Sequence, residues 1–155
     1  MGKFQSTKIF DGFSTVFRQW KAKDTHCKFL HGYAVEFKAT FEGDLDYRNW
    51  VWDFGGMKRS KTKIDGMSAK EWMDYTFDHT TVIANDDPEL NIFTEMDRSG
   101  IIQLRILEAT GAEKFSEYIF NKLNEFVIQE TDSRVKIIRV EFSENKKNTA
   151  IYEAD

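Results

Sequence analysis

The chain has few of the residues that cross-link a fold or interrupt it: its 155 residues include one cysteine, one proline and three histidines. A single cysteine excludes an internal disulfide framework, so we expect a reducing, cytoplasmic location. No apolar run approaches the length of a membrane span, and the first residues lack a signal-peptide core. Acidic residues (26) outnumber basic ones (22), and no clustered basic face predicts nucleic-acid binding. We therefore expect neither a membrane nor a nucleic acid as partner.

Aromatic residues are abundant by contrast, with 14 Phe, 5 Tyr and 4 Trp. Together with the near absence of proline, they favour a β-rich structure with large side chains inside it or at subunit contacts. A chain of this length is typical of one domain, and no repeat, low-complexity tract or linker divides it. We expect a single domain over residues 1–155.

Alternation of apolar and other side chains predicts the strands. A long strand over residues 4–20 should be bulged near Gly12, and 32–41 should return beside it as a hairpin partner. The segment 135–142 changes phase between Ile137 and Ile138, as a β-bulge would produce, and 150–152 should pair with it. A further short strand is expected within 101–107.

Capping signals predict where the helices begin. Asp53 is placed to cap a short glycine-weakened helix, and Ser68 with Glu71 forms a capping box. Asp87 followed by Pro88 predicts another helix start. Thr110 to Glu113 fits a second capping box, which should open the best amphipathic helix. Its apolar positions are Phe115, Ile119, Leu123, Phe126 and Val127. The order predicts an α+β fold with helices on one face of an antiparallel sheet.

A thiol and an imidazole lie four residues apart just before the second expected strand, in Cys27-Lys28-Phe29-Leu30-His31-Gly32-Tyr33. Loop residues at the mouth of a rigid strand are well positioned for chemistry. The plainer interpretation is a small buried cysteine beside a hydrogen-bonded histidine. The spacing alone does not decide between them.

Motifs further along the chain favour the functional interpretation of Cys27 and His31 over the structural one. Six short motifs follow one another along the chain. In order, they are Phe13-Ser14-Thr15-Val16-Phe17, Cys27-x-x-x-His31-Gly32-Tyr33, Trp52-Asp53-Phe54 with Lys58, Phe77-Asp78-His79, Ala109-Thr110-Gly111-Ala112-Glu113, and Glu144 with Ala150-Ile151-Tyr152. In this order and spacing the sequence resembles the 6-pyruvoyl-tetrahydropterin synthase and 6-carboxy-tetrahydropterin synthase family. The resemblance covers nearly the whole chain.

The resemblance implies the tunnelling fold, built from two antiparallel hairpins and two helices. It also implies a homo-oligomer, trimer or hexamer, with active sites at subunit boundaries. Cys27 would be the base that removes a proton from a dihydropterin side chain, and Asp78 with His79 would form a proton relay. Glu144 would bind the pterin, because a carboxylate accepts two parallel hydrogen bonds from a 2-amino-4-oxopterin. Glu113 is explained as a helix cap and is not taken as a site residue.

The metal is the main departure from the family pattern. Family members bind zinc through three histidines, and only His31 stands at such a position here. Phe17 and Tyr33 occupy the other two positions. Because a catalytic zinc generally needs three protein ligands, we expect zinc at the family position to be absent. Its loss would remove a Lewis-acid contribution of several kcal/mol, which slows such a reaction by orders of magnitude.

Three functions remain open at this point. The first is a lyase-type pterin synthase acting on dihydroneopterin triphosphate, or a related pterin, by proton transfer and elimination. The spacing of Cys27 and His31 looks most like the carboxy-forming branch used in queuosine biosynthesis. The second is a non-catalytic pterin- or purine-binding oligomer, and the third a purely structural assembly domain. Retention of Cys27, Asp78 and His79 favours the enzyme, because a mere binder does not need a proton relay.

Overall fold

Two long antiparallel strands, β1 (Gln5–Phe17) and β2 (His31–Gly43), form the centre of the fold. The computed structural model describes residues 2–155. The strands pair from Gln5 with Glu42 to Phe17 with His31, and their register shifts between Phe10 and Phe13. Gly12 lies at this shift with a φ of 84°, a conformation that glycine adopts at little cost. The predicted bulge is confirmed.

Four further strands extend this pair into a six-stranded sheet in the order β4-β3-β1-β2-β5-β6. Strands β5 (Val135–Ser143) and β6 (Thr149–Glu153) form the second antiparallel hairpin. Its register against β2 skips Ile138, so the bulge predicted there is also confirmed. On the other side, β3 (Thr80–Ala84) and β4 (Leu104–Leu107) run parallel to β1. The sheet is therefore mixed: the two predicted antiparallel hairpins are confirmed, and β3 and β4 add a parallel edge that the prediction of an antiparallel sheet did not include.

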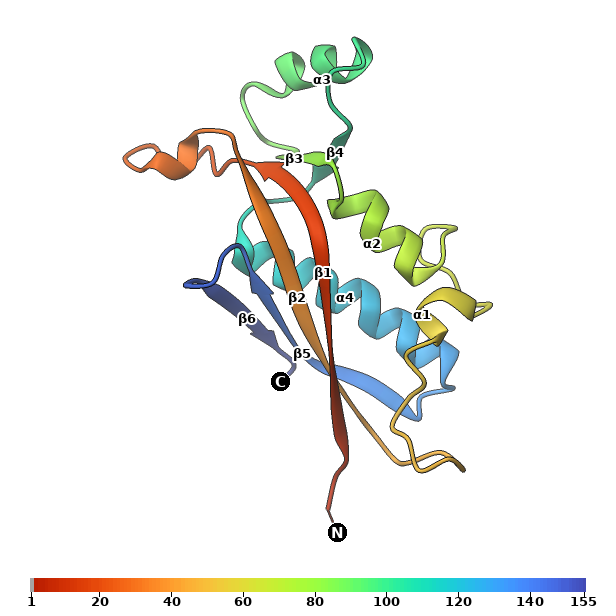
Figure 1. Cartoon of the computed structure of the whole chain (residues 1–155). Helices are drawn as coiled ribbons and strands as arrows, with labels where there is room; N and C mark the ends of the chain where they lie inside the picture. The colour runs from red at the N-terminus through yellow and green to blue at the C-terminus, as the bar shows by residue number, and fades with distance from the viewer. Residues whose placement is uncertain (1) are drawn as a thin grey trace.

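The longest helix, α4 (Ala112–Glu130), crosses one face of the sheet (Figure 1). The shorter helices are α1 (Gly56–Arg59), α2 (Ala69–Phe77) and α3 (Leu90–Arg98), with a 3₁₀ turn over His26–Lys28. Helix α2 lies beside α4, whereas α3 stands at the end of the sheet near β3 and β4 (Figure 1). The core is a layer of aromatic and aliphatic side chains between sheet and helices. Its largest fully buried members include Trp72, Phe13, Phe17, Phe37, Phe41, Phe77, Phe115, Phe126 and Phe142.

The start of α2 follows its sequence signal: Ser68 accepts from the Glu71 N–H, and Glu71 accepts from the Ser68 N–H. The start of α4 does not. Its N-cap is Gly111, with a φ of 113°, and the Thr110 hydroxyl donates to the Arg18 carbonyl at 2.6 Å. The capping box predicted from Thr110 to Glu113 is therefore wrong, because a tertiary hydrogen bond takes the threonine away from the helix.

Two other predicted caps are displaced by polar contacts. Helix α3 begins at Leu90, and Asp87 instead holds the Arg18 guanidinium through two short bonds, at 2.6 and 2.8 Å. This ion pair ties the end of β1 to the segment before α3. Asp53 accepts from the Gly55 N–H at 2.9 Å and precedes α1 without capping it. Each aspartate lies two residues before the N-cap of its helix, Gly55 or Glu89, so neither is the N-cap, although Asp87 also accepts from the Glu89 N–H at 2.9 Å.

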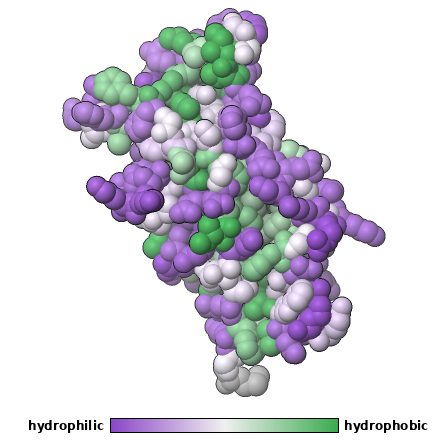
Figure 2. Space-filling model, viewed as in Figure 1, coloured by the Kyte–Doolittle hydropathy of each residue, from purple (hydrophilic) through white to green (hydrophobic). Residues whose placement is uncertain are grey.

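The surface seen in Figure 2 is mainly hydrophilic, with separate apolar patches, one of them at the α3 end. Exposed apolar side chains near that end include Ile92 and Ile101. Among residues 2–155, no helix is both long and apolar enough to cross a membrane.

Candidate functional site

Cys27 lies in a short turn that is fixed by hydrogen bonds on both sides. The Thr25 hydroxyl accepts from the Cys27 N–H at 3.1 Å, and the Cys27 carbonyl accepts from the Gln19 N–H at 2.8 Å. The thiol is free and partly buried. The turn therefore holds the cysteine just before the start of β2, where the sequence predicts it.

Three aromatic rings lie together where β1 ends and β2 begins. The Tyr33 ring stacks on Phe17, with centroids 4.3 Å apart and an interplanar angle of 19°. His31 packs against Tyr33, also at 4.3 Å. Phe17 is fully buried and meets Phe115 of α4 edge-on at 4.9 Å. We call Phe17, His31 and Tyr33 the aromatic triad; its rings are anchored to the core through Phe17.

The Tyr33 phenol is held in its neutral form. Burial raises its pKa to about 12, and the negative charges of Glu144 and ionised Cys27 add to the effect. Strand β2 pairs with β5 as far as Glu36 and Ser143, so Tyr33 and Glu144 lie at the same end of that pair. Gln19, whose N–H donates to the Cys27 carbonyl, lines the pocket that contains Glu144.

Glu144 follows β5 and lies with Glu113 of α4 in a polar pocket of about 420 Å³. Its remaining lining residues are Gln19, Ala112, Lys147, Asn148, Thr149 and Ala150. Partial burial raises the pKa of Glu144, the Glu113 carboxylate raises it further, and His31 acts in the opposite direction. A carboxylate beside a polar pocket can accept hydrogen bonds from a ligand with two adjacent N–H groups.

Glu113 is the pocket residue that sequence reasoning missed. The capping-box interpretation accounted for its side chain, but Thr110 is bonded to Arg18 instead. A signal was present: Gly111 follows Thr110, and with its positive φ it becomes the N-cap of α4, which leaves Thr110 outside the helix. Glu113 therefore faces the same pocket as Glu144 and does not cap α4.

Glu144 should make stability depend on pH. Because folding raises its pKa above the ordinary value of 4.5, the folded chain binds the proton more tightly than the unfolded chain. The free energy of unfolding is then expected to fall as pH rises from 4.5 through the raised pKa. Glu144→Gln should raise the urea midpoint at neutral pH and match the wild type below pH 4.5. Urea titrations across this range test it, and a variant that gains nothing at neutral pH contradicts it.

Asp78 and His79 form a separate pair at the end of α2. The His79 Nδ1 lies 3.0 Å from Asp78 Oδ1, and that oxygen also accepts from the Ser14 N–H at 3.1 Å. His79 has a φ of 57° and a largely exposed ring, while its backbone N–H donates to the Ser14 carbonyl. The carboxylate can orient the imidazole, as a relay requires. Within residues 2–155, no hydrogen bond or ion pair joins this pair to Cys27 or His31.

The sequence model of the 6-pyruvoyl tetrahydropterin synthase family matches residues 7–155, almost the whole chain. The chain belongs to the 6-pyruvoyl tetrahydropterin synthase family. The resemblance inferred from the motifs is confirmed, and the α+β architecture agrees with the tunnelling fold of the family's solved structures.

Solved structures share this fold at low sequence identity. An uncharacterized protein from Wolinella succinogenes superposes with a TM-score of 0.81 at 21% identity, over 100% of both chains. The 6-pyruvoyl tetrahydropterin synthase of Caenorhabditis elegans gives 0.62 at 19%, covering 100% of this chain and 98% of that one. The synthase of Plasmodium falciparum gives 0.62 at 16%, over 97% and 98%. No curated protein matches the chain.

The family's zinc does not fit the residues present in this member. Two of the three ligand positions hold Phe17 and Tyr33, whose rings stack on each other, and the Tyr33 ring packs against His31. Phenylalanine supplies no ligand atom, and the tyrosine's raised pKa disfavours the phenolate that would bind a metal. Among the described residues 2–155, no three His, Cys, Asp or Glu side chains are grouped to hold a metal ion. Family membership therefore does not carry the family's metal ligands to this chain.

Proposed function

We propose that the protein is a cytoplasmic, single-domain pterin-site lyase that acts on dihydroneopterin triphosphate or a close relative without zinc at the family position. Family membership supports the substrate class. The observation that carries the proposal is the polar pocket of about 420 Å³ that contains Glu144, because Gln19, which is bonded to the Cys27 carbonyl, also lines it. The reaction type rests on the residues that this member keeps.

Glu144 has the pterin-binding role in this proposal. Its carboxylate accepts from the 2-amino group and the adjacent ring N–H, which fixes the ring in one orientation. The ionised form is needed, so the raised pKa makes binding weaken at a higher pH than it would with an ordinary glutamate. Glu113→Gln should lower the pKa of Glu144 by removing a like charge and so extend binding to lower pH. Measuring the affinity of the wild type and of Glu113→Gln for neopterin across a range of pH tests this. Identical pH profiles of the two affinities would contradict it.

Cys27 is the proposed base. Its thiolate takes a proton from the substrate side chain, and the electron pair left on carbon drives the loss of triphosphate as the C–O bond breaks. The neutral Tyr33 hydroxyl, held near Cys27 and Glu144, can donate a hydrogen bond to an oxygen that gains charge in this step. Tyr33 occupies one of the positions at which family members have a zinc-binding histidine.

Asp78 and His79 complete the proposal only if a second copy supplies them. In one chain they lie beside Ser14, and within the described residues 2–155 no hydrogen bond or ion pair joins them to the Cys27 turn. We therefore propose a homo-oligomer, trimer or hexamer, whose subunit boundary brings the relay of one copy to the Cys27 of the next. The aspartate would hold the imidazole in the tautomer that returns a proton to the product.

Cys27→Ala provides the test of the enzymatic proposal. We expect neopterin binding to stay within about threefold, since the thiol is not a recognition group, while triphosphate release falls by at least about 100-fold, the usual size of a general-base contribution. Phosphate detection with product mass spectrometry measures the rate, and calorimetry measures binding. Ser14→Ala is the matched control, because only its backbone contacts the relay. Unchanged turnover in Cys27→Ala would overturn the proposed base.

A non-catalytic pterin- or purine-binding oligomer is the second candidate function. The aromatic triad at the metal position favours it, because the electrophile of the family reaction is missing there. In that case the wild type binds neopterin through Glu144 but releases no triphosphate. Slow alkylation of Cys27 near neutral pH would accompany this outcome, since an inert thiol has no base function.

A further inference from the structure

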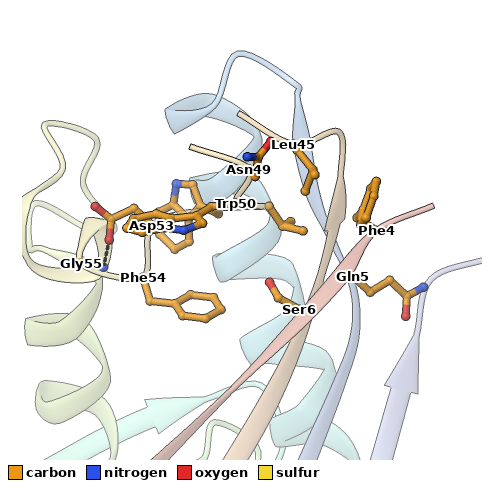
Figure 3. Close-up of a pocket in the computed structure, with 11 residues that line it drawn as sticks. Phe4, Gln5, Ser6, Leu45, Asn49, Trp50, Asp53, Phe54 and Gly55 are labelled. Carbon is orange, nitrogen blue, oxygen red and sulfur yellow. Dashed lines mark hydrogen bonds between the residues drawn. The ribbon is translucent and has the colours of Figure 1, made fainter. Parts of the chain in front are cut away.

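A second pocket lies at the opposite end of the sheet, between the start of β1 and the segment that leads into α1 (Figure 3). Its volume is about 540 Å³, and it shares no lining residue with the pocket around Glu144. The lining residues are Phe4, Gln5, Ser6, Leu45, Asn49, Trp50, Val51, Trp52, Asp53, Phe54 and Gly55. We call it the tryptophan pocket.

Four aromatic residues line the tryptophan pocket: Phe4, Trp50, Trp52 and Phe54. Trp50 is half exposed, and the Arg48 guanidinium covers one face of its ring at 4.3 Å, so the pocket meets the rest of the indole. Trp52 is fixed from behind by Phe41 at 5.5 Å, and Phe54 meets it edge-on. Flat walls of this kind favour a flat aromatic ligand.

Hydrogen bonds hold the segment that carries Trp50 in one shape. Asp46 accepts from the N–H groups of Arg48 and Trp50, and its own N–H donates to the Trp50 carbonyl at 2.8 Å. Arg134 of the neighbouring turn donates to the Val51 carbonyl, also at 2.8 Å. Because this pocket wall is ordered in advance, a ligand would not have to order it on binding.

One buried polar atom inside the pocket lacks a partner. The Ser6 hydroxyl is buried and, among residues 2–155, makes no hydrogen bond. Figure 3 shows it on the pocket floor, opposite Asn49. Buried hydroxyls normally have a partner, because leaving one unpaired costs free energy. A ligand atom that bonds to this hydroxyl would remove that cost.

Charge at the rim is balanced, which argues against a charged ligand. The Asp46 and Asp53 carboxylates pair with the Arg48 and Arg59 guanidinium groups, at 2.9 to 3.4 Å. The pocket thus offers aromatic surface and one unused hydroxyl without a free charge on its rim. We propose that the tryptophan pocket binds an uncharged, flat heteroaromatic molecule of nucleoside size, its ring on Trp50 and its polar edge on Ser6.

The direct test is ¹⁹F NMR of the full chain labelled with 5-fluorotryptophan, titrated with adenosine and guanosine. The chain has four tryptophans, whose signals are assigned by replacing each with phenylalanine. We expect the signals of Trp50 and Trp52 to shift. Those of Trp20 and Trp72 should stay, because neither lines this pocket. No shift with either nucleoside at millimolar concentration would overturn the proposal.

Two variants separate recognition from folding. Trp50→Ala should weaken nucleoside binding at least about tenfold by removing the stacking surface. Ser6→Ala should weaken it roughly 5- to 10-fold, the usual worth of one hydrogen bond, while the melting temperature stays the same or rises because an unpaired hydroxyl is removed. A Ser6→Ala variant that loses both binding and stability would indicate a structural serine instead.

Three other results bear on the proposal. Toluene binding that is as tight as nucleoside binding and unaffected by Ser6→Ala would indicate only an apolar hole, and would contradict it. A change of oligomer mass in Trp50→Ala would make the pocket an interface between copies, which also contradicts it. Glu144→Ala should leave the Trp50 and Trp52 shifts intact; this separates the tryptophan pocket from the pterin site, so that either proposal can fail alone.

Discussion

Glu144→Ala is expected to weaken neopterin binding by two to four orders of magnitude. The carboxylate would make two charge-assisted hydrogen bonds to the pterin, each worth about 1.5–3 kcal/mol. At about 1.4 kcal/mol per factor of ten, their joint loss gives this range. Isothermal titration calorimetry with neopterin measures it directly. Removing the side chain should not harm folding, because the ionised carboxylate is destabilised by its partial burial and by Glu113.

Glu113→Ala is the matched control for this experiment. Glu113 lines the same pocket and carries the same charge, so a general electrostatic effect would appear equally in both variants. We expect Glu113→Ala to change affinity at neutral pH by much less than Glu144→Ala. Equal losses in the two variants, or an affinity within fivefold of wild type in Glu144→Ala, would remove Glu144 from its proposed role.

Restoring histidine at positions 17 and 33 is expected to create a zinc site. The rings of Phe17 and His31 both lie 4.3 Å from Tyr33, so three imidazoles would converge there, the ligand number of catalytic zinc sites. Phe17→His with Tyr33→His should retain about one zinc per chain after dialysis, whereas the wild type retains none at this position. Elemental analysis by plasma mass spectrometry measures the difference.

The single variants are the controls, because each supplies two histidines at most and should lose its zinc on dialysis. Phe17 is fully buried, so the double variant must be shown to fold, by circular dichroism and oligomer mass. A folded double variant that binds no zinc would contradict the geometry of the aromatic triad. Stoichiometric zinc in the dialysed wild type would contradict our interpretation of Phe17 and Tyr33.

Local pattern predicted the parts of the fold that local forces determine. The apolar spacing from Phe115 to Val127 gave α4, and the phase change at Ile138 gave the bulge in β5. The strand expected within 101–107 is found as β4, but its parallel pairing with β3 could not be foreseen in the same way, because strand direction depends on where the chain crosses the sheet. Thr110 failed as a cap for a similar reason: its partner, Arg18, is distant in the sequence.

The sequence supplied candidate residues for the site but not their arrangement. Cys27, Asp78, His79 and Glu144 came from a resemblance to a family, and the structure adds that Gln19 is bonded to the Cys27 carbonyl and lines the pocket of Glu144. The resemblance implied sites at subunit boundaries but not which residues each copy supplies. Within residues 2–155, no hydrogen bond or ion pair joins Asp78 or His79 to Cys27. Tyr33 was predicted only as a lost ligand, whereas its stacking on Phe17 shows what occupies the metal position.

The measurement that most directly tests the central claim is triphosphate release from dihydroneopterin triphosphate by the wild-type protein, dialysed against a chelator. We predict release with formation of an elimination product of lower mass, at a rate that added zinc does not raise, and its loss in Cys27→Ala. No release, with neopterin binding intact and dependent on Glu144, would contradict the claim and establish a binding protein without the family's chemistry.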